Sequence, residues 1–399
     1  MKIIGYNSSH ETSLCQFDNE TWEIDFLYEE ERFRRAKYWN PRYPNDQLLC
    51  IDRNEIKNPD AFIGASFDRR NSPLAFDVDK ISHDFALQRK LIEFIQQEQL
   101  TTERTQQLIE EFKSAIKDDD YKHLAKDYAE KNFLSSDTDD DLHGRVADQL
   151  EMDEFHYEIE HHLYHAECGY WFSPWREKEK AIAVTMDGGG AMKHMEEFPN
   201  FQEAETIFLC EPDKVPTRQY SRMSNYRWIT DSIENPVLFN SQRGNLLTAP
   251  SVIKTIDGCE TVFNSYPSQG MNFSALSLFF GFDQKGRAAG KVMGAASYQD
   301  WKETEDGYID WSVHSMCNLL QQKSFEFTCN LIQKAIDLNP DVPNIILSGG
   351  FALNCTNNAK YLERFPNHQI FVDPVAHDGG TAVGAAIRLG RAIKQGEEV

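Results

Sequence analysis

Short apolar runs and partial alternation of apolar and polar residues mark the first 65 positions as strands. Lys2–Asn7 contains two adjacent isoleucines and ends in a polar turn, and residues 12–17 and Glu23–Glu29 partly alternate. Ala61–Ala65 is a further short apolar run. Runs of this length between polar turns are typical of strands. We therefore predict a three-stranded meander at the N-terminus, followed by a fourth strand.

From about residue 81 to residue 160 the pattern becomes helical and polar. Leu87, Leu91, Phe94 and Ile95 fall at positions i, i+4, i+7 and i+8, which is the spacing of one helix face. Two runs of three aspartates interrupt this segment, at 118–120 and 139–141. Acidic runs of this kind are most often solvated loops. We interpret the segment as an acidic helical insertion and the two runs as loops within it.

The second half of the chain alternates between strand-like and helix-like patterns. The strands are expected at Ala181–Met186, 206–210, 344–347 and Gln369–Val372. The helices are expected at 270–281, at 313–337, from about Phe351 and after residue 380. This alternation is typical of an α/β fold. Because both halves begin with strands, we expect two similar lobes, residues 1–175 and 176–399, with the insertion of about 81–160 in the first.

Composition excludes several classes of protein. The 399 residues include 41 Lys and Arg against 64 Asp and Glu, and this net charge of −23 disfavours broad nucleic-acid or membrane surfaces without forbidding a local basic groove. No apolar run approaches the roughly 18 residues of a membrane span, and the start lacks the apolar core of a secretory signal. Eight cysteines without a C-x-x-C pair are typical of reduced thiols, so we expect a cytoplasmic protein that does not bind membranes.

Three strand-to-turn junctions carry glycine: DGGG at 187–190, SGG at 348–350 and DGG at 378–380. Glycine lets backbone N–H groups approach an anion closely, and a following helix N-terminus adds partial positive charge. An aspartate at such a turn can hold a metal or a ribose. None of the three turns matches a Walker A loop or a G-x-G-x-x-G fingerprint. Together they predict a cleft that binds phosphate or a nucleotide.

A histidine cluster at 161–165 (HHLYH) is a candidate metal site. His161 and His165 are four residues apart and would share a helix face, and His162 with His165 is the alternative pair. The zincin pattern H-E-x-x-H is absent, because His162 stands in the place of its glutamate, and this argues against a protease. Asp378 is the best candidate for a third, oxygen ligand. A mixed histidine and carboxylate set suits Fe(II), Mn(II) or Zn(II).

Two further features are ambiguous by themselves. His10 follows the first strand in a serine-rich turn, and a lone histidine is usually not catalytic. The charged segment EEERFRRAK at 29–37 is either a solvated face or a set of cations aimed at an anion. In the second case arginine would supply a bidentate grip and lysine a point charge.

Taken together, these motifs resemble the O-carbamoyltransferase family that includes the nodulation-factor and tobramycin carbamoyltransferases. The matching segments, in the family's order, are the opening strand with His10, EEERFRRAK at 29–37, HHLYHA at 161–166, DGG at 187–189, GRAAGKVMGAASY at 286–298, LSGGFALNC at 347–355 and HDGGTAVGAA at 377–386. The family's transferase domain looks like the actin and sugar-kinase superfamily. The resemblance therefore implies an α/β fold of two ribonuclease-H-like lobes, with a helical insertion in the first lobe and a nucleotide in the cleft.

The resemblance also assigns roles to individual residues. It implies that a divalent metal, with iron the family-typical ion, is bound by His161, His165 and Asp378. It implies that the nucleotide is lined by Asp187, Gly188, Gly189, Gly349, Gly350 and Asn354. Lys37 and Lys291 fall where the family's motifs carry cations, and His10 falls on the family's proposed catalytic histidine.

The implied reaction uses ATP and carbamoyl phosphate, which give carbamoyl-adenylate, a mixed anhydride with a good leaving group. His10 would take the proton of an acceptor hydroxyl as its oxygen attacks the carbonyl, and the product is an O-carbamoyl ester. We expect the acceptor to be the hydroxymethyl group of a modified pyrimidine, such as hydroxymethylcytosine in DNA, or a hydroxyl of a small antibiotic or sugar. A tRNA-modifying carbamoyl-transfer ATPase and a non-catalytic nucleotide-binding subunit are the alternatives.

Two features depart from the family pattern. Ala289 stands where the family usually has glutamate before its G-K-V-M-G segment, so the local hydrogen bonding differs there. The chain also ends at Val399, just after the Gly-Ala-Ala helix, whereas full-length members continue into a domain that forms the adenylate. We therefore expect either a separate adenylate-forming domain or protein as a partner, or a cut or naturally short form of the chain.

Overall fold

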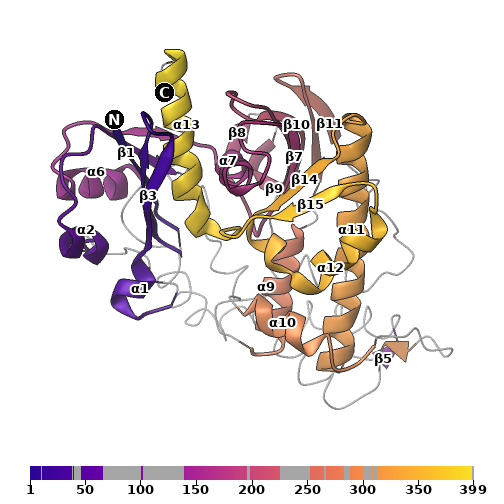
Figure 1. Cartoon of the computed structure of the whole chain (residues 1–399). Coiled ribbons are helices and arrows are strands. Elements are labelled where there is room, and N and C mark those ends of the chain that lie inside the picture. Colours follow the sequence, from indigo (N-terminus) through magenta and orange to yellow (C-terminus); the bar gives the residue numbers. More distant parts are fainter. Residues whose placement is uncertain are drawn as a thin grey trace.

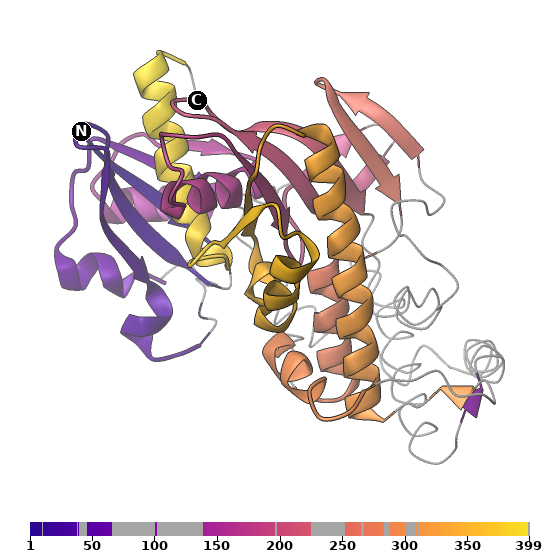
Figure 2. The same ribbon diagram turned by 45° about the vertical axis from the view of Figure 1, so that its right-hand side comes forward.

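Two mixed β-sheets surrounded by helices make up the described part of the chain (Figures 1 and 2). The computed structural model describes residues 1–9, 11–37, 39, 46–65, 100–101, 139–195, 198–224, 252–264, 267–282, 288–300, 308–309 and 312–397. His10 lies outside these residues, and so does most of the insertion predicted at about 81–160.

The first sheet contains β1, β2, β3, β4 and β6 in the order β3-β2-β1-β4-β6. Their bounds are Lys2–Asn7, Ser13–Asp18, Glu23–Glu29, Ala61–Ala65 and His156–Glu158. β2 runs antiparallel to both of its neighbours, whereas β1, β4 and β6 are parallel. Ile3 of β1 enters one apolar cluster while Ile4 and Tyr6 enter another. Burial on both faces explains why β1 and β4 are mostly apolar.

The second sheet has β7, β9, β10, β14 and β15 at its core, with β11 and β12 at one edge and β8 paired to β9. The bounds, from β7 to β12, are Ala181–Met186, Met192–Met195, Phe198–Cys210, Thr217–Ser224, Val252–Ile256 and Cys259–Asn264, followed by Asn344–Ser348 for β14 and Gln369–Val372 for β15. β9 is antiparallel to β7 and β10, and β7, β14 and β15 are parallel.

The core of the second sheet repeats the arrangement of the first. In each sheet the five strands lie side by side as the third, second, first, fourth and fifth in chain order, and only the second runs against the others. No matching repeat is visible in the sequence, so the similarity lies in topology. The repeated arrangement confirms the predicted α/β fold of two ribonuclease-H-like lobes.

Two helices connect the sheets. α7 (His162–Phe172) follows the last strand of the first sheet, and α13 (Thr381–Gln395) follows the last core strand of the second. α13 nevertheless packs on β1, β2 and β4, so the C-terminal helix covers one face of the N-terminal sheet (Figure 1). Tyr164 of α7 joins the same cluster, whereas Ala166 of α7 packs against the second sheet.

These helices contact their neighbours backbone to backbone. A Cβ atom at Gly384 of α13 would lie 2.0 Å from the carbonyl oxygen of Tyr164, and a Cβ atom at Gly5 of β1 would lie 2.0 Å from that of Ala382. Only glycine permits such approaches. α13 is therefore held between α7 on one side and β1 on the other.

Most of the other helices surround this frame. Their bounds are Glu30–Arg34 (α1), Leu49–Asn54 (α2), Asp139–Gln149 (α6), Gln269–Phe279 (α9), Ala289–Ala295 (α10), Val313–Leu338 (α11) and Cys355–Arg364 (α12). The 3₁₀ turns η4 (Gly350–Leu353) and η5 (Asp378–Gly380) follow β14 and β15. The short strands β5 (Leu100–Thr101) and β13 (Tyr308–Ile309) pair with each other.

Three boundaries differ from the sequence prediction. The aspartates at 139–141 begin α6 instead of forming a loop, because acidic side chains in a first helical turn are stabilised by the helix dipole. The insertion cannot extend to residue 160, because β6 belongs to the first sheet. The helix expected from Phe351 starts as a 3₁₀ turn, and α12 begins only after Asn354, whose side chain accepts a hydrogen bond from the backbone of Asn357.

The lobe boundary at residues 175 and 176 stays a prediction. Among the described helices, none combines the length and the apolar character needed to cross a bilayer. None of the eight cysteines forms a disulfide, and of the eight only Cys355 is exposed.

Replacing Gly384 with alanine should destabilise the protein, because the added methyl group would collide with the α7 backbone. We expect the free energy of unfolding to fall by about 2 kcal/mol or more, as for an overpacked core. Urea unfolding followed by circular dichroism measures it. Gly290→Ala in α10 is the matched control, since a Cβ there meets no atom within 4 Å, and it should be neutral or slightly stabilising. Equal losses in both variants would contradict the importance of this contact.

Candidate metal centre

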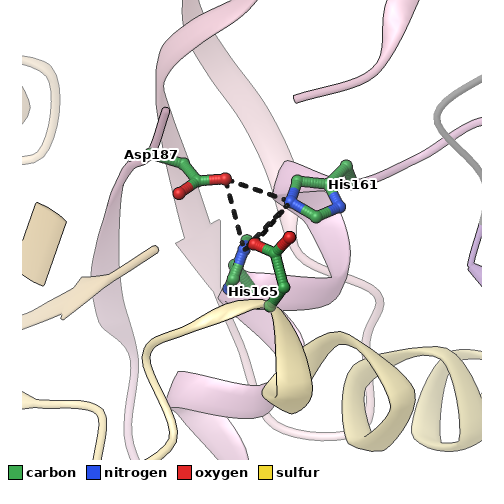
Figure 3. Close-up of side chains that lie close together, drawn as sticks. His161, His165 and Asp187 are labelled. Carbon is green, nitrogen blue, oxygen red and sulfur yellow. Dashed lines mark hydrogen bonds and ion pairs between the residues drawn. The ribbon is translucent and has the colours of Figure 1, made fainter. Parts of the chain in front are cut away.

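The first turn of α7 brings two imidazoles together. His161 is the N-cap residue and has helical backbone angles, so its side chain lies on the same face as that of His165. Their Nε2 atoms are 3.1 Å apart, and both side chains are fully buried (Figure 3). The pair at spacing four is therefore the one whose ring nitrogens converge.

Asp187, at the end of β7, faces this pair. Its Oδ2 atom lies 3.2 Å from Nε2 of His161 and 3.9 Å from Nε2 of His165 (Figure 3). Its other oxygen, Oδ1, accepts a hydrogen bond of 3.1 Å from the backbone N–H of Gly350. The carboxylate thus connects the turn after β14 to the two histidines.

Asp378 completes the cluster from the N-terminal side of α13. Its Oδ1 atom is 3.5 Å from Nε2 of His161 and 3.8 Å from Nε2 of His165. The backbone around it is fixed by the first lobe, because its N–H donates to Glu11 Oε2 and its carbonyl accepts from Asn7 Nδ2, both at 3.0 Å.

The four side chains form a donor set that suits a divalent cation. One ligand atom from each of His161, His165, Asp187 and Asp378 lies within 4.8 Å of all the others, and all four residues are buried. Bonds of about 2.1 Å to a central ion place neighbouring ligand atoms roughly 3–3.5 Å apart, close to the separations seen here. Two imidazoles and two carboxylates suit Fe(II), Mn(II) or Zn(II).

The electrostatics of the cluster also fit a bound cation. Burial opposes protonation of His161, but hydrogen bonds to Asp187 and Asp378 raise its pKa to about 9. Burial and the charge of Asp378 act to raise the pKa of Asp187, yet its hydrogen bond to His161 and the nearby His165 lower it overall. Two adjacent buried carboxylates thus retain a cationic partner, and a metal ion bound by both histidines would replace the proton.

His162 lies outside this cluster. Its Nδ1 atom is 2.8 Å from the hydroxyl oxygen of Thr206, and burial is the main cause that lowers its pKa to about 3. A Cβ atom at Gly190 would lie 2.6 Å from the His162 ring, so the imidazole is packed against the glycine turn. The alternative metal pair of His162 and His165 is not the one that the fold assembles.

The first two glycine turns meet at Asp187. Gly349 has a positive φ of 83°, and a Cβ atom there would lie 2.2 Å from the carbonyl oxygen of Met186. The Gly188 carbonyl accepts a hydrogen bond of 2.6 Å from the hydroxyl of Ser268, and a Cβ atom at Gly189 would touch the Gln202 side chain. The assignment of these turns to a nucleotide stays a prediction.

The remaining residues that the sequence predicted for the site do not belong to the four-residue cluster. Asn354 is buried, and its Oδ1 atom accepts hydrogen bonds from Gln321 Nε2 at 2.7 Å and from the Asn357 N–H at 3.3 Å. Lys37 is exposed after α1, and exposed Lys291 donates to the Phe282 carbonyl at 2.9 Å. His10 lies outside the described residues. Nucleotide, anion and catalytic roles for these residues stay predictions.

Sequence analysis missed two groups beside the cluster. His377 precedes Asp378, and its ring nitrogens lie 3.3 Å from Glu11 Oε2 and 3.1 Å from Glu29 Oε1. Burial lowers the pKa of His377, but these two carboxylates raise it to about 10. The available signals were that His377 and Glu11 each adjoin a predicted site residue and that His377 begins the HDGGTAVGAA segment.

Removing one imidazole should abolish tight metal binding. We expect one divalent ion per chain in the parent, and His165→Ala should bind it at least 100-fold more weakly, because a neutral methyl group cannot replace a ligand. Plasma mass spectrometry after dialysis and a competitive chelator titration measure this.

The control for that experiment is His368→Ala, a half-buried histidine outside the cluster. It should retain the ion. Unchanged metal content in His165→Ala would contradict the assignment of the site.

Removing the charge of Asp187 should weaken metal binding without breaking its turn. In Asp187→Asn the side-chain oxygen can still accept from Gly350, but the negative charge is lost. We expect metal affinity to fall at least 10-fold, measured by the same chelator titration, while thermal unfolding shows a folded protein. Affinity equal to that of the parent would show that Asp187 is not a ligand.

Comparison with solved structures finds distant likenesses. Full-length HypF in its phosphate- and nucleotide-bound form is 12% identical, with a TM-score of 0.49 over 98% of this chain and 56% of that chain. A ROK family glucokinase from Streptomyces griseus, in complex with glucose and AMPPNP, is 12% identical, with a TM-score of 0.38 over 97% of this chain and 99% of that one. Xylulose kinase from Rhodospirillum rubrum is 10% identical, with a TM-score of 0.35 over 98% of this chain and 91% of that one.

Sequence comparison is more specific. Residues 322–387, which include Asp378 and both later glycine turns, match the model of the carbamoyltransferase N-terminus. A segment of 54 residues is 43% identical to the nodulation protein NolNO of Sinorhizobium fredii (strain NBRC 101917 / NGR234), and it covers 14% of this chain and 8% of that protein. Both matches are to carbamoyltransferase-related sequences, and the chain matches only a small part of that relative's length.

Proposed function

We propose that this chain is an O-carbamoyltransferase that moves a carbamoyl group from carbamoyl-adenylate to an acceptor hydroxyl. The observation that carries the proposal is the buried cluster of His161, His165, Asp187 and Asp378 where glycine turns meet, in a chain whose residues 322–387 match the carbamoyltransferase N-terminus. A divalent cation bound by these four residues would supply positive charge that stabilises the phosphate of the leaving group. Fe(II) is our first candidate, with Mn(II) and Zn(II) as alternatives.

The reaction balances without an oxidant or reductant. The acceptor oxygen attacks the carbamoyl carbon and forms a new C–O bond. The bond from that carbon to the phosphate oxygen of AMP breaks, and its electron pair leaves with AMP. The hydroxyl proton passes to a general base, for which we propose His10. The products are AMP and an O-carbamoyl ester.

The residues of the chain have distinct parts in this proposal. Backbone N–H groups of the turns at 187–190 and 348–350 would hold the nucleotide, with Asn354 and the cations Lys37 and Lys291 assigned by family resemblance. Glu11 adjoins His10 and accepts from the Asp378 N–H, so it ties the base-bearing turn to the metal cluster. ATP and carbamoyl phosphate would reach the site as the adenylate, made by a separate domain or protein.

The acceptor we propose is the hydroxymethyl group of hydroxymethylcytosine in DNA. Basic residues of the segment at 29–37 lie close to His10 in sequence and would flank a polynucleotide.

A small-molecule hydroxyl is the second candidate. It is favoured by the ion pairs of Arg32 with Glu29 at 2.8 Å and of Arg34 with Glu30 at 2.7 Å, because paired guanidinium groups bind phosphate less readily.

A transfer assay tests both the reaction and the base. The chain receives ATP, labelled carbamoyl phosphate, Fe(II) and a separate adenylate-forming domain, with hydroxymethylcytosine DNA, unmodified DNA or an aminoglycoside as acceptor. We expect label in hydroxymethylated DNA alone, read by mass spectrometry. His10→Ala should reduce transfer at least 100-fold, as loss of a general base does.

Metal content is the control, since His10→Ala should keep its bound ion. Label only in the aminoglycoside would move the acceptor to the small-molecule class. No label in any acceptor, with the added domain shown to make adenylate, would refute the proposed function.

A further inference from the structure

A cavity of about 490 Å³ adjoins the metal cluster and has no part in the reaction as described so far. It lies between β3 and α1 of the first lobe and the link from β15 to η5 of the second. Its apolar walls come from Leu27, Tyr28, Phe33, Pro374 and Val375. Its charged residues are Glu29, Arg32 and His377. The cavity is open to solvent, and its volume lies within the range of small-molecule sites.

The cavity is joined to the metal cluster through His377. This residue lines the cavity and directly precedes Asp378. Glu11 faces His377 at 3.3 Å and accepts from the Asp378 N–H at 3.0 Å, so the cavity wall and the metal-ligand turn form one hydrogen-bonded unit. A molecule in the cavity would therefore contact the residue that precedes a predicted metal ligand.

The aromatic walls are held in place before any ligand arrives. Tyr28 stacks on Phe26 with ring centroids 4.4 Å apart and planes at 11°. Phe33 meets Tyr28 edge to face, with centroids 5.4 Å apart and planes at 75°. Pre-ordered rings lose little conformational entropy on binding, and they favour a flat ligand that can pack against them.

The charges at the cavity are already paired within the protein. Glu29 lies 2.8 Å from Nε of Arg32 and 3.1 Å from Nε2 of His377, and these two partners also face Glu31 at 3.7 Å and Glu11 at 3.3 Å, so every charged lining residue is already engaged. A polycationic aminosugar would find no unpaired carboxylate among these lining residues. An uncharged ring avoids this mismatch.

We propose that this cavity binds the ring of the acceptor, a flat and uncharged ring that carries the reacting hydroxyl, such as a hydroxymethylated pyrimidine. The inference rests on the proposed carbamoyl transfer and names the acceptor class for that site. The ring comes either from a free nucleoside or from a base of a polynucleotide. Both would bring the same flat ring to the wall that contains Tyr28 and Phe33.

The test measures binding directly and does not depend on turnover. Three probes are titrated into the full chain by calorimetry: 5-hydroxymethyl-2′-deoxycytidine, a single-stranded oligonucleotide with one such base, and tobramycin. Phe33→Leu keeps apolar volume but removes the flat ring, so Kd for the bound pyrimidine probe should rise at least 10-fold. Phe33→Tyr should restore it.

Phe325→Leu is the matched control, because Phe325 stacks on Tyr361 in the second lobe and should leave Kd unchanged. Thermal unfolding verifies that each variant is folded. In the transfer assay, Phe33→Leu should raise the acceptor KM by a similar factor and change kcat little.

The outcomes separate this inference from the proposed function. The proposal is supported if a pyrimidine probe binds and Phe33→Leu weakens that binding. Binding of the nucleoside would identify a free nucleoside as the source of the ring, and binding of the oligonucleotide alone would identify a polynucleotide. Preference for tobramycin, no binding of any probe, or binding indifferent to Phe33→Leu overturns it. Absence of carbamoyl transfer in the parent, while the pyrimidine probe still binds at Phe33, would refute the reaction and leave the binding site.

Discussion

The backbone contact between α7 and α13 is the constraint on which the rest of the structure depends. Each helix begins at the end of one sheet and packs into the core of the other lobe, so neither sheet is covered by its own helices alone. Gly384 allows the two backbones to touch. The first turns of both helices are thereby placed next to each other, and these turns carry His161, His165 and, just before α13, Asp378.

Burial gives the cluster its chemistry. Two carboxylates and two imidazoles lie almost without contact with water, where an unpaired charge is costly. Within the protein they compensate one another through a shared proton, and a divalent cation does the same with more charge. The adjoining cavity differs, because its lining carboxylate, Glu29, is already paired with Arg32 and His377. In our proposal the four-residue cluster thus binds a cation, and the adjoining cavity binds a neutral ring.

Much of the fold could be predicted, because buried strands appear in the sequence as short apolar runs. The strands β1, β3, β4, β7 and β15 have the bounds that the sequence predicted. The pairing of His161 with His165 followed from helix periodicity, but periodicity could not exclude His162, since tertiary packing decides which face meets Asp187. The direction of the Asp187 carboxylate is not encoded by a DGG turn. The approach of His377 to Glu11 joins residues from opposite ends of the chain, and no local pattern records it.

The two oxygens of Asp187 connect two binding events. One oxygen faces the histidines, and the other is held by the N–H of Gly350, in the turn that we assign to the nucleotide. Any shift of that turn on donor binding alters the position of a metal ligand. Thermodynamic linkage then requires reciprocity: if the cation tightens donor binding by some factor, the donor tightens cation binding by the same factor. With both sites as proposed, this one carboxylate would make occupancy of the metal site depend on occupancy of the nucleotide site.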